Sequence, residues 1–367
     1  MKYVDEYRDP RLAKSLVAQI RQTATRRHVV MDVCGGQTHG LVRHGIEEVL
    51  ADDVELIHGP GCPVCVTSTE AIDFAQCLAQ RDDVILCSFG DMMRVPGSRV
   101  SLLDVRSQGG NVAPIYTPMD AVTMAGEMPE RQVVFFAVGF ETTAPATALA
   151  VLQAEQRGLE NFSMVVSHVR VLPAMDTLMR APDNRVEAFL AAGHVCTITG
   201  YQSYTPFTDN HSVPVAITGF EPVDLLRGIH EVICQLESGR HEVVNCYPRS
   251  VREEGNLAAM KAINKVYEIA DQPWRGFGVV AEGGLRLRAG YRQFDAQHRF
   301  ADAIPVPMID RSSCRSGDVL AGRIKPIDCE HFAGDCHPDH PLGAPMVSSE
   351  GACAAYYRYR SQQKTTI

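Results

Sequence analysis

Short apolar runs that alternate with helical segments constrain the fold of this chain more than any other feature. Residues 28–33, 54–57 and 84–89 are rich in Val, Ile and Leu, and a loop follows each run. Residues 132–138 open a second series and form the most strand-like run in the chain. Nearly continuous apolar strands that alternate with helices are typical of a parallel sheet covered on both faces. The sequence therefore predicts an α/β protein.

The two series predict two similar parallel-sheet, Rossmann-like lobes around a cleft. We expect residues 26–129 to form the first lobe and residues 130–245 the second. Further strands are expected near residues 162–167, 194–199 and 214–218. In such sheets ligands bind beside the carboxyl ends of the strands, so the loops after the strands are the candidate functional segments.

The two ends of the chain are predicted to form a separate part. Residues 1–25 contain a helix, which we expect to pack on the C-terminal module. From about residue 246 the alternation stops, and we expect a helix over 251–270 and short strands within 276–292. The last fifty or so residues are rich in cysteine, and residues 246–367 are therefore predicted to be a metal-bearing C-terminal module.

Composition excludes several classes of function. The chain has 367 residues and a net charge of −9, without a basic run, so no nucleic-acid partner is expected. No apolar run approaches the length of a membrane span, and the first residues do not resemble a signal peptide. We expect a cytoplasmic protein without membrane contact. Its 12 cysteines then indicate metal binding or thiol chemistry rather than a disulfide scaffold.

Residues 59–65 read Gly-Pro-Gly-Cys-Pro-Val-Cys and lie between a strand and a helix start. Amide groups and the positive end of the helix dipole favour thiolate there. Pro63 stiffens the spacer, so Cys62 and Cys65 suit a pair that opens and closes as a disulfide. Half of a zinc site is the alternative, although no second CxxC or HxxxH lies nearby.

Cys34 and His39 lie on the loop that follows the first strand. A thiolate with an imidazole suits a first-row metal such as iron, whereas a structural cysteine and a surface histidine are the plainer alternatives. Glu141 and Thr142 follow the strand 132–138; they could line the cleft, or Thr142 could only cap the next helix. Since consecutive strands usually lie side by side, the Cys34 loop and the CxxC loop are expected to share one rim, faced by Glu141 and Thr142.

Four late cysteines, among Pro and Gly turns, could hold zinc or an iron–sulfur cluster. Their wide spacing favours a [4Fe–4S] cluster over the tight knuckles of structural zinc sites, and four unrelated buried thiols remain the plain alternative. The four candidate ligands are Cys314, Cys329, Cys336 and Cys353.

Three common motifs are absent from the sequence. It contains no P-loop, no dinucleotide-binding Gly-x-Gly-x-x-Gly after a strand and no Cys-x-x-x-Cys-x-x-Cys.

Four motifs occur together and in order, at residues 34–39, 59–65, 139–145 and 348–353. They read Cys-Gly-Gly-Gln-Thr-His, Gly-Pro-Gly-Cys-Pro-Val-Cys, Gly-Phe-Glu-Thr-Thr-Ala-Pro and Ser-Ser-Glu-Gly-Ala-Cys. With these motifs the chain resembles the HypD family of hydrogenase maturation factors along essentially its whole length. One departure concerns Ser316, which stands where family members often carry a second cysteine two residues after Cys314.

The resemblance implies a scaffold that assembles the Fe(CN)2CO unit of [NiFe]-hydrogenases with a HypC-type small chaperone and a HypE-type cyanide donor. It implies that Cys34 binds the iron in transit, with His39 beside it, and that Cys62 and Cys65 form a redox-active pair. The four late cysteines would hold a [4Fe–4S] cluster, with Cys314 replacing the ligand lost at Ser316. Two rival hypotheses are a cluster-linked thiol–disulfide oxidoreductase acting on a partner protein and a zinc-stabilised binding protein.

Overall fold

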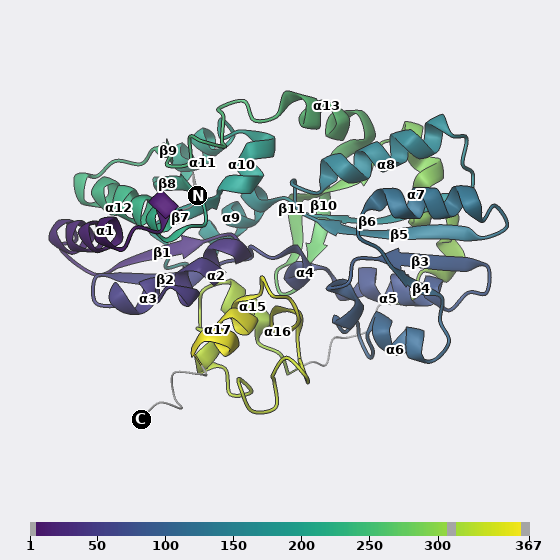
Figure 1. Ribbon diagram of the computed structural model, residues 1–367, viewed down its shortest axis with the longest axis horizontal. Helices are drawn as coiled ribbons and strands as arrows, with labels where there is room; N and C mark the ends of the chain where they lie inside the picture. Colours follow the sequence, from purple (N-terminus) through teal and green to yellow (C-terminus); the bar gives the residue numbers. More distant parts are fainter. Residues whose placement is uncertain (1–4, 307–312, 361–367) are drawn as a thin grey trace.

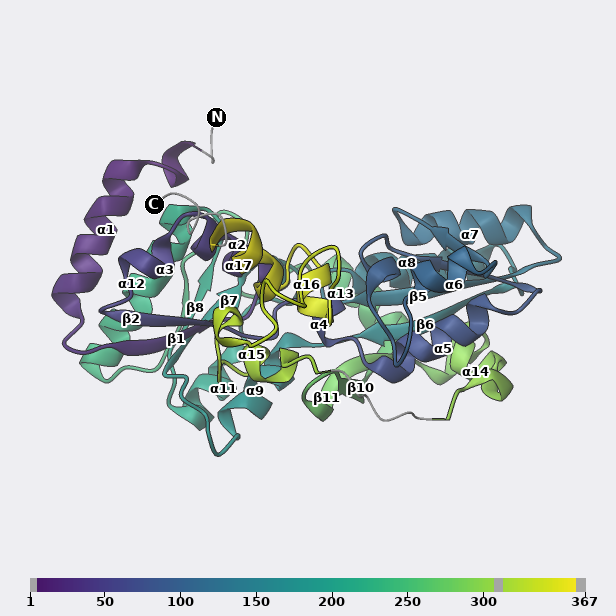
Figure 2. The same cartoon turned by 90° about the horizontal axis from the view of Figure 1, so that it is seen from below.

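Two α/β lobes lie side by side in the computed structural model, which describes residues 5–306 and 313–360. A smaller C-terminal part lies against the junction of the two lobes (Figures 1 and 2). The expected α/β class is confirmed: the structure contains two parallel sheets, of five and four strands, and one antiparallel hairpin. None of the helices in these ranges is long and apolar enough to cross a membrane.

The first sheet is parallel, with the strand order β2-β1-β7-β8-β9. Strand β1 pairs on one side with β2, at the edge of the sheet, and on the other with the central strand β7, so that Val30 lies between Leu56 and Ala188. Near-continuous burial along β1, β2, β7 and β8 fits the burial of both faces of the sheet, whereas the edge strand β9 is half-buried. The strands are β1 (His28–Asp32), β2 (Val54–His58), β7 (Ala188–Ala192), β8 (Val215–Thr218) and β9 (Val243–Asn245).

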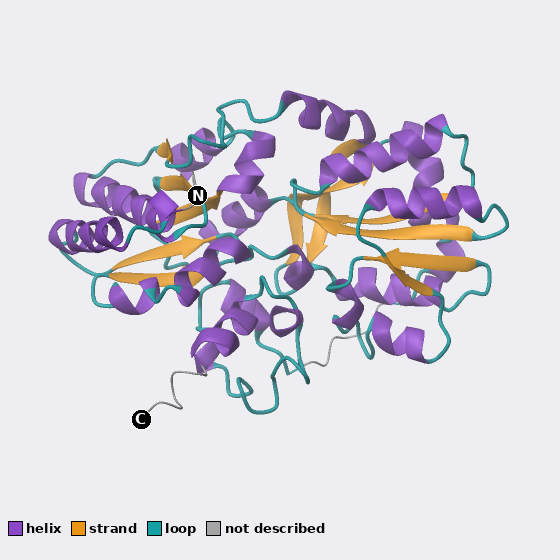
Figure 3. Cartoon of the chain, in the orientation of Figure 1, coloured by secondary structure: helices purple, strands orange, loops and turns teal. Residues whose placement is uncertain are grey.

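The second sheet, also parallel, has the order β4-β3-β5-β6. Residues Val133 to Gly139 of its central strand are all buried. The antiparallel hairpin packs beside β6, between the two lobes (Figure 3). The strands are β3 (Val84–Ser88), β4 (Val112–Pro114), β5 (Gln132–Gly139) and β6 (Phe162–His168), and those of the hairpin are β10 (Tyr267–Trp274) and β11 (Gly278–Leu287).

Helices cover both sheets, and one hydrophobic core runs through both lobes and into the C-terminal part, including Met31, Phe136 and Val347. The helices are α1 (Pro10–Thr23), α2 (Gly35–Arg43), α3 (Ile46–Val49), α4 (Pro63–Val66), α5 (Thr69–Ala79), α6 (Leu102–Ser107), α7 (Pro118–Glu127), α8 (Ala144–Gln156), α9 (Val171–Met179), α10 (Gly193–Thr199), α11 (Tyr204–His211), α12 (Pro222–Ser238), α13 (Leu257–Val266), α14 (Ala296–Arg299), α15 (Ser316–Leu320), α16 (Ala344–Val347) and α17 (Ala352–Arg360).

Two expected elements are wrong. Residues 194–199 form helix α10 instead of a strand, because the fully buried strand β7 ends just before them at Ala192. The helix expected over 251–270 is shorter, since α13 ends at Val266 and the chain continues as β10. In both places β-branched and apolar residues fit either element, and tertiary packing decides between them.

The strands are divided between the two sheets differently from the lobe boundaries predicted from the sequence. β3 and β4, expected in lobe 26–129, pair with β5 and β6, whereas β7 and β8, expected in lobe 130–245, pair with β1. The chain therefore passes from the first sheet to the second through α4 and α5, and it returns to the first sheet through α9.

The two ends of the chain also pack differently from the prediction. Helix α1 packs on α12 of the first lobe instead of on the C-terminal module. Within 246–367, helix α13 packs on α8 of the second lobe and the hairpin packs on β6, while α17 packs on α2 of the first lobe.

Candidate functional site

The carboxyl ends of the two sheets face a common cavity of about 290 Å³. Strand order reverses between β1 and β7 in the first sheet and between β3 and β5 in the second. Such switch points open a crevice, and α/β proteins bind ligands there. Loops after strands of both sheets line the cavity, together with one C-terminal segment: Gly61, Pro63 and Val64; Phe89, Asp91 and Met92; Val138 to Phe140, Thr142 and Thr143; His194; and Ser348 to Glu350.

Cys34 and His194 meet at the switch point of the first sheet. Cys34 directly precedes α2, and its Sγ lies 3.7 Å from Nδ1 of His194 in the first turn of α10. Burial raises the pKa of Cys34 to about 12, although the amides of Gln37 and Gly36 lower it. Burial also lowers the pKa of His194 to about 4. At neutral pH a thiol therefore faces a neutral imidazole, whose ring nitrogen can accept a proton or bind a metal.

The sequence does not single out His194 as a site residue. It falls inside the strand expected at residues 194–199, whereas in the structure it follows the Gly that comes directly after β7. A glycine and a histidine at the end of a buried apolar run were the available signal. The pairing of β1 with β7 brings His194 to Cys34, and no local sequence pattern predicts this pairing.

A close contact between two loops fixes the backbone at Cys34. The neighbouring loops after β1 and β2 meet, as expected, where the amide of Gly35 donates to the carbonyl of Gly61 over 3.0 Å. A Cβ atom at Gly61 would lie 2.2 Å from the amide nitrogen of Cys34, so only glycine permits this approach. Gly35 in turn allows the C-terminal segment to approach, because a Cβ there would lie 2.3 Å from the carbonyl oxygen of Glu350.

His39 lies on α2 but not on the cavity wall. Its Nε2 is 2.8 Å from the hydroxyl of Tyr359 on α17. Burial and the nearby Arg358 lower the pKa of His39. The geometry therefore assigns His39 to the contact between α2 and the C-terminal part, and His194 occupies the place beside Cys34 that was expected for it.

Glu141 and Thr142 follow β5 and point to different places. Thr142 lines the cavity, as one of the two expectations had it. Glu141 does not line it: its Oε1 accepts a hydrogen bond of 3.1 Å from the amide of Val171, at the start of α9. The other carboxylate oxygen is buried without a hydrogen-bond partner, and burial raises the pKa of Glu141. Glu141 thus stabilises the N-terminus of the helix through which the chain crosses between the lobes.

Cys62 and Cys65 form a disulfide at the start of α4. Both residues are buried, at 2% and 0% exposure. Pro63 occupies the first turn of α4 and lines the cavity, so the disulfide lies behind the cavity wall, in the segment that crosses between the lobes. Helix α16 of the C-terminal part packs against α4.

The four late cysteines line one small pocket in the C-terminal part, together with Ser316 and His331. None of the four forms a disulfide. The amide of Leu342 donates to Sγ of Cys336 over 3.4 Å, and a Cβ at Gly343 would lie 2.2 Å from Sγ of Cys314. A small residue and an amide donor around converging sulfur atoms fit a [4Fe–4S] cluster.

The geometry of a single metal ion is different from that of a cluster. Across residues 5–306 and 313–360, no three His, Cys, Asp or Glu side chains are grouped so that they could hold a metal ion. In a [4Fe–4S] cluster each iron takes one thiolate, so the sulfur ligands stand further apart than around one ion. Ser316 hydrogen-bonds with Cys314, so both side chains are available on the same wall of the pocket.

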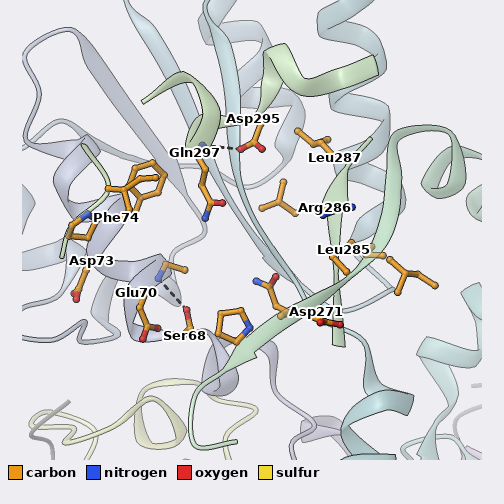
Figure 4. Close-up of a pocket in the computed structure, with 18 of the residues that line it drawn as sticks. Ser68, Glu70, Asp73, Phe74, Asp271, Leu285, Arg286, Leu287, Asp295 and Gln297 are labelled. Atoms are coloured by element: carbon orange, nitrogen blue, oxygen red, sulfur yellow. Dashed lines mark hydrogen bonds between the residues drawn. The ribbon is translucent and has the colours of Figure 1, made fainter. Parts of the chain in front are cut away.

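A larger cavity, of about 640 Å³, lies away from all of these cysteines, between α5, the hairpin and the start of α14 (Figure 4). Several of its polar groups already have partners within the chain. Asp73 accepts from Ser98, Asp271 accepts from the amide of Glu282, and Asp295 accepts from the amide of Gln297. Because no motif residue lines it, the smaller cavity beside Cys34 is the candidate site.

The fold and the site define a two-lobed α/β protein in which Cys34 and the Cys62–Cys65 pair follow neighbouring strands, directly behind residues that line a cavity between two sheet edges. The family described as "HypD: Hydrogenase formation hypA family" matches residues 11–360. The chain therefore belongs to the HypD family of hydrogenase maturation factors, which confirms the resemblance read from its motifs.

Relatives span the chain from end to end. It is 43% identical to the hydrogenase maturation factor HypD of Escherichia coli (strain K12), over 371 residues that cover 99% of each chain. It is also 43% identical to HypD of Azotobacter vinelandii, over 100% of this chain and 99% of the relative. Identity to HypD2 of Bradyrhizobium diazoefficiens is 44%, over 98% of this chain and 97% of the relative.

Proposed function

We propose that this protein is a scaffold on which the Fe(CN)2CO unit of [NiFe]-hydrogenases is assembled, with iron held through Cys34. The observation that carries the proposal is the pairing of Cys34 with His194 at a switch point, beside a cavity of about 290 Å³. Iron is the cargo, and His194 takes the place that the family resemblance suggested for His39. The cavity leaves room for small diatomic ligands and for the thiolate of a partner.

The protonation states of the two residues support this role. With the pKa of Cys34 raised to about 12, the thiol keeps its proton until a cation displaces it. With the pKa of His194 lowered to about 4, the imidazole stays neutral and its lone pair is available. The pair is thus suited to taking up Fe²⁺ with release of one proton from Cys34.

The C-terminal cysteines would hold a [4Fe–4S] cluster as the resident cofactor. Bound there, the cluster would supply single electrons to the redox steps of assembly. Opening the Cys62–Cys65 disulfide takes two electrons and two protons and leaves two thiols. Helix α16, which packs on α4, connects this module to the disulfide. In this role the protein would act in the cytoplasm with a HypC-type chaperone and a HypE-type cyanide donor.

Replacement of Cys34 by Ala tests the proposal. The complex of the variant with a HypC-type chaperone should lose the infrared bands of iron-bound cyanide and carbonyl while the fold is kept. His194→Gln should weaken the bands more than His39→Gln, because only His194 lies beside Cys34. Cys87→Ala is the matched control, since Cys87 is equally buried but lies in strand β3. Undiminished bands in the Cys34→Ala complex would place the iron elsewhere.

A thiol–disulfide oxidoreductase acting on a partner protein is the second candidate function, and the Cys62–Cys65 disulfide favours it. Both functions require that this bond opens. Reduction followed by denaturing alkylation should therefore label two more thiols per chain than the oxidised protein, and Cys62→Ser should abolish this difference. If the pair never oxidises at cytosolic potentials, the thiols have a structural or permanent metal-binding role.

A further inference from the structure

A buried polar network joins the Cys34 loop to the C-terminal part. It runs from Asp32 at the end of β1, through His58 at the end of β2, to Tyr356 on α17 and Glu47 on α3. All four residues are at most 3% exposed. The network lies outside the cavity and takes no part in the chemistry proposed above.

At one end of the network, Asp32 holds the first turn of α2. Its Oδ1 accepts from the hydroxyl of Thr38 over 2.6 Å, and its Oδ2 accepts from Nδ1 of His58 over 2.5 Å. The amide of Thr38 bonds the carbonyl of Cys34 over 3.0 Å, which is the first backbone bond of the helix. The position of Cys34 is therefore tied to Asp32 through Thr38.

At the other end of the network, Glu47 forms a hydrogen bond and ion pairs with residues of the C-terminal part. The hydroxyl of Tyr356 donates to both carboxylate oxygens, at 2.6 and 2.8 Å, and Nε2 of His58 lies 3.2 Å from the same hydroxyl. Nη2 of Arg360, on α17, lies 3.0 Å from Oε2 of Glu47, and Lys325 forms a further ion pair with Glu47. Docking of α17 thus supplies Glu47 with two of its partners, the Tyr356 hydroxyl and the Arg360 guanidinium.

The charges in the network stabilise one another. Burial alone would lower the pKa of His58, but Asp32 and Glu47 outweigh it and raise the pKa to about 9. His58 is therefore a cation between two carboxylates at neutral pH. Buried ion pairs contribute little net stability compared with apolar packing. Their presence here favours a role in fixing a position.

Two of the candidate cluster ligands lie close along the chain to residues that contact Glu47. Cys353 and Tyr356 lie one turn apart on α17. Lys325 directly precedes the short helix Pro326–Asp328, and Cys329 directly follows it. The segments that carry two of the four candidate ligands are thus held against β2 and α3 of the first lobe.

We infer that Asp32, His58, Glu47 and Tyr356 are positioning residues: they dock the cysteine-bearing helix α17 against the Cys34 loop and so hold Cys34 in its buried place beside His194. The inference rests on the proposed role of Cys34. It predicts that a hydroxyl removed at either end of the network loosens Cys34 specifically, while the rest of the fold is kept.

The test compares Tyr356→Phe and Thr38→Val with the unaltered chain, purified anaerobically without partner proteins. The rate at which iodoacetamide alkylates Cys34 is followed by mass spectrometry of its peptide. Each variant loses a hydrogen bond to a carboxylate, so local opening should increase and the rate should rise about tenfold or more. Absorption of the C-terminal module and the melting temperature report on the rest of the fold.

Two controls separate positioning from general loosening. Thr38→Ser keeps the hydroxyl and should restore a rate within about twofold of the unaltered chain. Tyr267→Phe removes an equally buried hydroxyl, bonded to Thr147 in the second lobe, and should leave the rate unchanged. Unchanged rates in Tyr356→Phe and Thr38→Val, or an equal rise in Tyr267→Phe, would overturn the inference. Since the thiol is measured without iron, this outcome is independent of the infrared test of Cys34→Ala.

Discussion

Replacing Gly61 with Ala is expected to displace Cys34 and to abolish the iron-bound cyanide and carbonyl bands of the complex. The new Cβ would lie 2.2 Å from the amide nitrogen of Cys34 and 2.3 Å from its Cα. Backbone cannot move aside as a flexible side chain can, so one of the two loops must shift. Forced overpacking of this kind costs about 3 kcal/mol of unfolding free energy.

The matched control is Gly90→Ala. Like Gly61, Gly90 follows a strand, in this case β3 of the second sheet, but a Cβ at Gly90 meets no atom within 4 Å. Its effect on stability should stay within about 0.5 kcal/mol. Chemical unfolding measures the free energy, and infrared spectra of the complex measure the bands. Intact bands in Gly61→Ala would show that the contact between the two loops is not needed for iron handling.

The second large effect is expected in the C-terminal part. The protein purified without oxygen should carry about four irons and four sulfides and absorb broadly as a brown solution. Cys336→Ala should reduce the iron to about zero, because one ligand and the amide bond from Leu342 are lost together. Stability should also fall, since metal-binding free energy is part of the folding free energy. Iron and sulfide assays after anaerobic reconstitution measure the effect.

Three further variants sharpen this experiment. Cys234→Ala, on α12 and outside the pocket, should keep the full iron content. Cys314→Ala should lose iron and Ser316→Ala should keep it, because thiolate is the preferred ligand of such clusters. The reverse result would make Ser316 the ligand. Stoichiometric zinc in the reconstituted protein would contradict the cluster and favour the zinc-stabilised alternative.

Several elements follow from local sequence because their signals are local. The apolar runs at 28–33, 54–57, 84–89 and 132–138 all form strands of parallel sheets. The helix expected after residues 59–65 also forms, as α4 followed by α5, and Ser68 caps α5 by accepting from the amide of Ala71. Capping, strand composition and proline at a helix start depend on a few neighbouring residues.

The partners of the candidate site residues did not follow from the sequence. Cys34 was identified, but its neighbour His194 lies 160 positions along the chain. His39 shares a motif with Cys34, yet its imidazole hydrogen-bonds with Tyr359 on α17. Glu141 and Thr142 are adjacent in the sequence, yet only Thr142 faces the cavity. Each of these outcomes depends on the packing of a distant segment.

The sequence by itself determined the α/β class, the positions of most strands, and the placement of Cys34 and the CxxC pair at strand ends. Only the tertiary structure decided that β1 pairs with β7 and that β3 joins β5. The physical reason is that strands buried on both faces are apolar almost throughout, so they carry no pattern that selects a neighbour. The choice depends on how helices and loops from distant parts of the chain pack over the sheets, and that choice creates the cavity beside Cys34.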